Sequence, residues 1–277
     1  MPKQVLAMQK PLVSIITVCY HAEELISETL HSAVHQTYDN IELVIVDGAS
    51  KDKTVEVAKQ FQAHIGTLIS EPDKGIYDAM NKGIKASKGE WVYFLNAGDS
   101  FFDELVLEDI FTKNDLTKYD LVYAKVQTKN EPSGIDYVTG EKIIFRDFFS
   151  RYPICHQATF TRKTAFDKIG LYDIQYRLAA DTEWFARFFK LFSDKALFID
   201  RVVAFYDIQG TTYHKRMEGY KEYLHFGKKH FPFFVSLKNQ TFYPLLWMKV
   251  KMIRSFQNAS WFKKYREQKF RKKRPVK

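Results

Sequence analysis

The chain has 277 residues, of which 45% are apolar and 27% are charged. This composition is typical of a globular protein and excludes a disordered, collagen-like or disulfide-stapled chain. No apolar stretch approaches the roughly 18 residues that a membrane-spanning helix needs, and the N-terminus lacks an apolar core of signal-peptide length. We therefore expect a cytoplasmic protein whose two cysteines act as small apolar residues.

The charges are distributed unevenly along the chain. Residues 1–210 carry 24 Lys and Arg against 30 Asp and Glu, a net charge of −6, whereas residues 211–277 carry 18 against 3, a net charge of +15. An acidic body is not expected to bind nucleic acid, while a basic segment suits an anionic surface. This shift predicts a boundary near residue 210 between a folded body and a basic C-terminal extension.

The first 110 residues alternate β-branched runs with helical patterns. In the helical pattern at 23–36, for example, Ile26, Leu30 and Val34 repeat at four-residue spacing along one helical face. The predicted strand and helix pairs are 12–18 with 23–36, 41–46 with 53–63, 65–69 with 76–86, and 91–95 with 105–111. Four successive pairs predict an α/β fold with a mostly parallel sheet and helices on both faces.

After residue 118 the strict alternation stops. Strand-like runs at 121–126, 154–161 and 196–206 surround a helical pattern at 181–192. Neither an internal repeat nor a Gly/Ser-rich linker separates these segments from the first half. We therefore predict that they form a mixed extension of the same sheet.

Polar side chains follow the first four predicted strands where each strand ends. Ligands bind beyond the carboxyl ends of the strands in an open parallel sheet, so these residues are candidate site residues. Asp47, Asp73 and Asp99 would converge at this edge, where three carboxylates repel one another unless a cation or a ligand compensates. The alternative is that each aspartate caps the helix that follows it. The set of three favours a site for a divalent cation and a nucleotide.

Two common nucleotide-binding motifs are absent from the sequence. No glycine occurs between Cys19 and Glu23, where a dinucleotide-binding fold needs its glycine-rich turn, and the phosphate-binding pattern G-x-x-x-x-G-K-[ST] is also missing. We therefore expect a bound phosphate to be held by the cation and by Lys74 or Asn81.

Four blocks, in this order and spacing, resemble the family 2 glycosyltransferases. They are VSIITVCY at 13–20, IVDGASKD at 45–52, SEPDKGIYDAMNKG at 70–83 and FLNAGD at 94–99. The resemblance covers about residues 11–210 and implies a GT-A fold, a nucleotide-sugar donor, a divalent cation (Mn2+ or Mg2+) and inversion at the anomeric carbon. It also implies one domain at 1–210, with a nucleotide-sugar half at about 11–115 and an acceptor half at about 116–210.

The resemblance further implies roles for individual residues. Asp47 would contact the nucleobase, Asp99 would bind the cation, and Asp181 would be the general base. A UDP-sugar is the expected donor. Donor contacts are expected from Tyr20, Asp47, Asp73, Lys74, Asn81 and Asn96, and acceptor or phosphate contacts from His156, Trp184 and His214. The alternatives are a helix cap for Asp181, structural roles for the two histidines and a core position for Trp184.

Three positions depart from the family pattern. Asn96 replaces the first acid of the Asp-x-Asp motif, Gly48 stands where many members have a second acid, and Ala180 replaces the Glu of the usual Glu-Asp pair. Fewer carboxylates predict weaker cation binding. The Gln-x-x-Arg-Trp signature of processive synthases is absent, which favours the transfer of one sugar.

The C-terminal extension, residues 211–277, combines its net charge of +15 with 15 of the 44 aromatic residues. Basic and aromatic residues together are typical of a helix that lies in a membrane interface. The sequence therefore predicts an inverting glycosyltransferase that is peripheral to the inner face of the cytoplasmic membrane. It would act on a glycan or lipid-linked acceptor in surface polysaccharide biosynthesis. The alternatives are a sugar-phosphate nucleotidyltransferase and a non-catalytic nucleotide-sugar-binding module.

Overall fold

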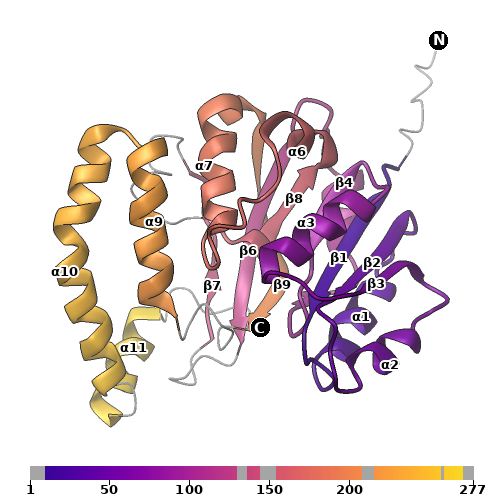
Figure 1. The fold of residues 1–277 in the computed structure, drawn as a ribbon, viewed down its shortest axis with the longest axis horizontal. Helices are drawn as coiled ribbons and strands as arrows, with labels where there is room; N and C mark the ends of the chain where they lie inside the picture. Colours follow the sequence, from indigo (N-terminus) through magenta and orange to yellow (C-terminus); the bar gives the residue numbers. More distant parts are fainter. Residues whose placement is uncertain (1–9, 130–135, 144–153, 208–214, 257–258, 271–277) are drawn as a thin grey trace.

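A computed structural model of the chain describes residues 10–129, 136–143, 154–207, 215–256 and 259–270 (Figure 1). In these residues, nine strands form one sheet in the order β3-β2-β1-β4-β8-β6-β9-β5, with β7 paired to β6. The strands are β1 Val13–Cys19, β2 Ile41–Asp47, β3 Ile65–Ser70, β4 Trp91–Phe94, β5 Ser100–Phe101, β6 Leu121–Lys129, β7 Val138–Thr139, β8 Thr159–Arg162 and β9 Ala196–Asp207.

Helices cover both faces of this sheet (Figure 1). They are α1 Ile26–Val34, α2 Thr54–Lys59, α3 Ile76–Ala86, α4 Val106–Thr112, α6 Lys163–Ile169, α7 Ala180–Phe192, α9 Arg216–His230, α10 Phe233–Phe256 and α11 Ser260–Phe270, with short 3-10 turns η1 His156–Ala158 and η2 Ser193–Lys195. Strands β1 to β4 pair in parallel, β8 runs antiparallel to both β4 and β6, and β6 pairs in parallel with β9. The predicted α/β class and the mixed extension of the sheet are confirmed.

The sheet separates two apolar cores. Along β1, Val13 and Ile15 belong to the core on the α1 and α4 face, whereas Ile16 and Val18 belong to the core on the α3 and α7 face. This alternation follows from the two-residue period of a strand, and it explains why the β-branched run is apolar without interruption.

Several predicted boundaries differ from the structure, and the helix expected at 23–36 spans Ile26–Val34. The helix expected at 53–63 ends at Lys59, and residues 60–63 form turns. The strand expected at 154–161 is a 3-10 turn at His156–Ala158 followed by β8. The turn places His156 beside the end of β4 rather than within the sheet ladder.

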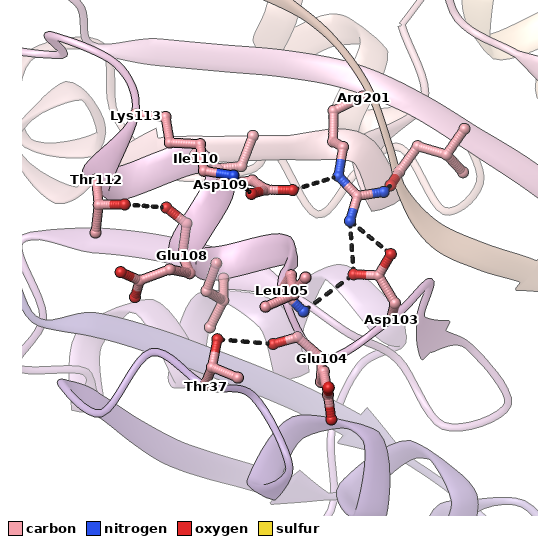
Figure 2. Close-up of polar contacts among 12 residues, drawn as sticks. Thr37, Asp103, Glu104, Leu105, Glu108, Asp109, Ile110, Thr112, Lys113 and Arg201 are labelled. Carbon is pink, nitrogen blue, oxygen red and sulfur yellow. Dashed lines mark hydrogen bonds and ion pairs between the residues drawn. The ribbon is translucent and has the colours of Figure 1, made fainter.

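Arg201 on β9 forms ion pairs with α4 and with the segment before it (Figure 2). The Arg201 guanidinium donates to both carboxylate oxygens of Asp103 at 2.6 Å and to Asp109 at 2.9 Å. On the same segment, the Glu104 carbonyl accepts from the Thr37 N–H at 2.9 Å. These contacts link α4 and the segment before it to β9 and to the loop between α1 and β2.

The charge boundary near residue 210 is not a packing boundary. Helix α9 packs on α7, and its residues Tyr223 and Phe226, with Phe231 after it, belong to the apolar core of the body. Helix α10 packs on α9, where the rings of Tyr220 and Tyr243 stack 5.6 Å apart. The predicted helical C-terminal region is confirmed, but its first helix, α9, packs against the apolar core of the preceding domain.

The rest of α10 and α11 leaves large apolar side chains exposed. Phe233, Phe234, Phe242 and Trp261 are 73%, 81%, 53% and 58% exposed. None of the helices in the described segments is both long and apolar enough to span a bilayer.

Candidate active site

The loops after β1 and β2 have unusual backbone conformations. His21 and Ala49 have φ angles of 50° and 61°, and they are the non-glycine residues with positive φ in the described part of the chain. Such conformations cost free energy and are concentrated at functional sites. Both residues lie at the carboxyl edge of the sheet, where the sequence predicts the ligand.

Tyr20, Gly48 and Asp73 lie close together at this edge. A Cβ atom on Gly48 would lie 2.6 Å from Asp73 Oδ2 and 3.1 Å from Tyr20 Cδ2. A side chain at position 48 would therefore require the Asp73 carboxylate to move. Tyr20 is 66% exposed, so one face of its ring is available to a ligand. The Gly75 N–H donates to Asp73 Oδ1 at 2.7 Å and fixes the carboxylate at the start of α3.

Asp47 is buried at the end of β2, next to this group of residues. The residue is 0% exposed, and its carboxylate accepts from the Ser50 N–H at 3.0 Å and the Ser70 hydroxyl at 2.6 Å, as well as from the Ser50 hydroxyl. The expected contact of Asp47 with a nucleobase stays a prediction. Its hydrogen bonds hold the loop that contains Gly48.

The two residues expected to hold phosphate lie in different environments. The Lys74 side chain is exposed at the start of α3, where it is accessible to a ligand. Asn81 is 7% exposed, and its amide donates to the Tyr172 carbonyl at 2.9 Å and accepts from the Tyr172 N–H at 3.0 Å. Asn81 thus links α3 to the segment before α7 in this structure, and its expected donor contact stays a prediction.

A chain of hydrogen bonds joins the end of β4 to the start of α7. His156 Nε2 lies 3.1 Å from the Asn96 amide nitrogen, and His156 Nδ1 lies 3.1 Å from Asp181 Oδ2. The Tyr77 hydroxyl donates to the other oxygen, Asp181 Oδ1, at 2.9 Å. If the Asn96 amide donates to Nε2, the proton of a neutral imidazole is on Nδ1 and points at Asp181. The sequence-predicted residues Asn96, His156 and Asp181 are therefore brought together.

This chain keeps the Asp181 carboxylate ionised. Burial, the largest single effect, raises the pKa of Asp181, but the hydrogen bond and charge of His156, the Tyr77 hydroxyl and the Thr182 N–H together hold that pKa below its usual value. The Asp181 side chain is 13% exposed and that of His156 is 15% exposed. A small opening thus remains through which an ionised carboxylate can accept a proton.

Asp99 is buried at the end of the loop that follows β4. Its Oδ1 accepts from the Asp207 N–H at 3.1 Å, and burial raises the pKa of its carboxyl to about 6, against smaller opposing effects of that N–H and of His156. Within the described residues, no three His, Cys, Asp or Glu side chains are placed to hold a metal ion. The buried Asn96 Oδ1 has no hydrogen-bond partner among those residues and is an oxygen left for a ligand.

The oxygens of Asp99 and Asn96 fit a hard divalent cation only in part. Mg2+ is often held by one or two protein carboxylates while substrate phosphates and water supply its other ligands. These donors therefore suit a cation that binds together with a diphosphate, and they do not form a self-sufficient metal site.

Trp184 lies in the apolar core. It is 0% exposed, its indole N–H donates to the Gly170 carbonyl at 2.8 Å, and its ring stacks on Phe188 at 5.6 Å. The aromatic pattern of α7 therefore forms core, which favours the core alternative for Trp184 over a sugar-stacking role. His214, the other expected phosphate contact, lies outside the described residues.

Sequence reasoning missed two residues that act on Asp181 or its helix. Tyr77 lies 104 positions from Asp181 in the chain, and Glu222 accepts hydrogen bonds from the backbone just before α7 although it lies in the basic extension. Tyr77 sits inside the block at 70–83, so its position in a matched motif was an available signal. Glu222, one of three acids in residues 211–277, offered no signal beyond its rarity.

Comparison with known proteins identifies the family of the chain. The family model described as "Glycosyl transferase family 2" matches residues 14–170, more than half of the chain. The chain is 32% identical over 207 residues to a "PGL/p-HBAD biosynthesis glycosyltransferase" of Mycobacterium bovis, covering 72% of this chain and 78% of the relative. Proteins of Mycobacterium tuberculosis with the same description match equally well.

Solved structures share the fold at lower identity. A mannosyltransferase from Pyrobaculum calidifontis in complex with GDP-Man and Mn2+ has a TM-score of 0.65 and 16% identity, covering 91% of this chain and 77% of that one. TarS 1-349 of S. aureus in complex with UDP-GlcNAc has a TM-score of 0.63 and 17% identity, covering 77% and 64%. The chain spans 39% of the longer TarS structure.

Proposed function

Because the chain belongs to glycosyltransferase family 2, we propose that it transfers one sugar from a nucleotide-sugar donor to a hydroxyl of a glycan or lipid-linked acceptor, with inversion at the anomeric carbon. The observation that carries the proposal is the convergence of Tyr77 and His156 on the two oxygens of Asp181. A buried but ionised carboxylate next to the predicted donor edge is the group that such a transfer needs.

The donor binds in this proposal at the carboxyl edge of β1 to β4. The exposed ring of Tyr20 lies against the nucleobase, and Asp73 lies beside it because Gly48 leaves room. Lys74, exposed at the start of α3, balances diphosphate charge. A UDP-sugar is the proposed donor, which the UDP-GlcNAc complex of a TarS structure supports, whereas the complex of the mannosyltransferase with GDP-Man makes GDP-sugars the first competitor to test.

Asp181 accepts the proton of the acceptor hydroxyl. A hydroxyl is a weak nucleophile at neutral pH, so a positioned base raises its reactivity as it attacks the anomeric carbon. The new bond forms between the acceptor oxygen and that carbon, and the bond to the diphosphate oxygen breaks with its electron pair. Attack from the face opposite the diphosphate inverts the anomer. The His156 and Tyr77 hydrogen bonds hold the base in place before the reaction.

A divalent cation, Mn2+ or Mg2+, is proposed to bind with the donor through Asp99. When bound, it would offset the negative charge that develops on the departing diphosphate. Asp99 must lose its proton to bind a cation, and its raised pKa of about 6 makes this step easier above that pH. The Mn2+ in the GDP-Man complex of the mannosyltransferase supports this assignment.

The surface formed by α10 and α11 is proposed to lie on an anionic membrane. Its exposed aromatic side chains, among them Phe233, Phe234 and Trp261, alternate with basic residues such as Lys249 and Lys251. Aromatic side chains enter the interfacial layer, while lysines attract anionic headgroups. A protein bound to the membrane in this way would lie close to a lipid-linked acceptor. This arrangement accords with the proposed location at the inner face of the cytoplasmic membrane.

The experiment is a donor screen with product analysis. UDP-GlcNAc, UDP-glucose, UDP-galactose and GDP-mannose are tested with and without Mn2+ by thermal shift, since a ligand that binds only the folded state raises its apparent stability. The protein is then assayed for release of nucleoside diphosphate, first to water and then to simple glycosides, and the anomeric configuration of the product is read by NMR. Release of pyrophosphate would indicate a nucleotidyltransferase, and binding without any turnover would indicate a binding module. A retained anomeric configuration would contradict the inverting mechanism.

A further inference from the structure

The carboxylate of Glu222 in α9 accepts three backbone hydrogen bonds from the segment directly before α7. The Arg177 N–H donates to Oε1 at 3.0 Å, and the N–H groups of Leu178 and Ala179 donate to Oε2 at 2.9 and 3.1 Å. Hydrogen bonds to a charged acceptor are about twice as strong as those between neutral groups. Glu222 therefore fixes the backbone that leads, two residues later, to Asp181.

The start of α7 needs such a partner. Ala179 occupies the N-cap position and cannot supply a capping oxygen from its side chain, so the N–H groups at this end depend on other residues. A negative charge near a helix N-terminus is also favourable because the helix dipole is positive there. The N–H of the N-cap residue Ala179 donates to Glu222, an acid of the basic extension 43 positions away.

Helix α9 contacts the same region at two further points. The ring of Phe226 meets that of Tyr176 edge-on at 5.6 Å, just before the Glu222 contacts. One turn into α7, His230 Nε2 lies 3.0 Å from Oε1 of Glu183, a side chain that is 3% exposed. Asp181 thus lies between two places where α9 contacts the backbone or side chains of its helix.

The position of Asp181 matters because its two oxygens face partners from other elements. Tyr77 from α3 and His156 from η1 approach at 2.9 and 3.1 Å, which leaves little room for α7 to move. A displacement of about 1 Å at a reacting group can cost on the order of a hundredfold in rate. We infer, on the basis of the proposed transfer, that Glu222 is a positioning residue that holds the Asp181 carboxylate at the acceptor hydroxyl.

The test compares Glu222→Gln and Glu222→Ala with Glu218→Gln. Glu218 is one turn earlier on α9 and exposed, so this variant makes the same change in charge without the backbone contacts. We expect kcat for sugar transfer to fall about tenfold in Glu222→Gln, whose amide oxygen still accepts some N–H groups, and about a hundredfold in Glu222→Ala. The Kd for UDP should stay within about twofold of the parent in all three variants, because the donor residues lie on other elements.

Two readouts separate positioning from a merely structural role. Calorimetric titration with UDP counts the folded sites, so kcat is expressed per binding site, and thermal unfolding checks the fold. In addition, the acidic limb of the kcat profile should move to higher pH in Glu222→Ala, because a displaced Asp181 loses hydrogen bonds from His156 and Tyr77 that lower its pKa. A loss of active sites alone would leave that limb in place.

The outcomes are distinct. Graded losses of kcat per site with an unchanged UDP Kd and a shifted limb support the inference. If the parent transfers sugar and Glu222→Gln keeps the parent kcat and pH profile, the inference is overturned and the proposed function stands. If the parent releases no diphosphate from any donor, the proposed function fails and the inference fails with it. Should Glu222→Ala not fold, Glu222→Gln alone decides between these results.

Discussion

Helices α9 and α10 follow one another in the chain, and both are rich in aromatic and basic residues, but they lie in different environments. Phe226 of α9 is 0% exposed and contacts the core of the body, whereas Phe234 of α10 is 81% exposed. Helix α9 also supplies Glu222 and His230 to the helix of the proposed base. The extension is therefore two regions: a helix that belongs to the catalytic body, and a pair of helices that offer a surface.

The largest effect is expected from a pair of alanine substitutions, one in α9 and one in α10, which compares the contributions of the two helices to stability. Phe226→Ala should lower the free energy of unfolding by about 3–5 kcal/mol, because it opens a cavity in a filled core. Phe234→Ala should change it by less than about 0.5 kcal/mol, because the ring is largely in solvent already. Urea denaturation of both variants measures the effect. Equal destabilisation would show that α9 and α10 are not energetically different.

A second prediction concerns the buried carboxylate that joins α7 to α9. Burial raises the pKa of Glu183, but its hydrogen bonds with His230 and Arg187 outweigh burial and lower that pKa below the usual value. A lowered pKa in the folded state stabilises the fold above the unfolded pKa of 4.5 and loses this contribution as pH falls through the folded pKa. We expect Glu183→Gln to cost roughly 3 kcal/mol at pH 7, because it leaves two buried partners without their acid.

The check is urea denaturation of the parent and the variant from pH 7 down to pH 3. The two curves should approach each other below about pH 4.5, as the parent loses the same charge. Asp194→Asn is the control, since the Asp194 side chain is 79% exposed. A constant difference between parent and Glu183→Gln at every pH would contradict the ionic link.

A third prediction concerns the removal of α11 and of the part of α10 after Phe242. A chain that ends at Phe242 should lose about 1–2 kcal/mol, from the stacking of Tyr243 on Tyr220 and the burial of Val250, and should still transfer sugar to a water-soluble acceptor. It should no longer sediment with anionic vesicles, because each Lys or Arg near such a surface contributes about 1 kcal/mol. Binding of the full chain should weaken with salt, since the Debye length falls from about 10 Å at 0.1 M to about 3 Å at 1 M.

Equal sedimentation of the two chains, or binding that does not depend on salt, would contradict the membrane proposal. If the shorter chain failed to fold, α10 would have to be counted with α9 as part of the body. Either result would change where the division within the extension lies.

Local sequence patterns predicted the fold because its strands follow β-branched runs and its first helices follow four-residue periods. These patterns did not predict local structure or burial where contacts between distant parts of the chain determine them. The 3-10 turn at His156–Ala158 lies in a stretch that looks like strand, and Trp184 lies on a helix face that packs against other aromatic residues. A periodic aromatic pattern indicates which face of a helix is apolar, but not whether that face meets the core or a ligand.

The candidate site was predictable to the extent that strand ends share one edge of a sheet. Asp73 and Tyr20 meet there as expected, because β1 to β3 are parallel neighbours. The burial of Asp47 and the pairing of Asn81 with Tyr172 were not predictable, since each depends on partners from another loop. The role of Glu222 was not predictable either. It lies 41 positions from the proposed base, and its hydrogen-bond donors are backbone N–H groups, which no sequence pattern marks.

The most direct test of the account is the turnover of Asp181→Asn with the donor that the screen identifies. Loss of the base should lower kcat for sugar transfer by on the order of a hundredfold or more, while the Kd of the donor stays near that of the parent, because Asp181 contacts Tyr77 and His156 rather than the donor pocket. Asp194→Asn, on the exposed turn after α7, should transfer like the parent. Near-parental turnover of Asp181→Asn would contradict the assignment of Asp181 as the base.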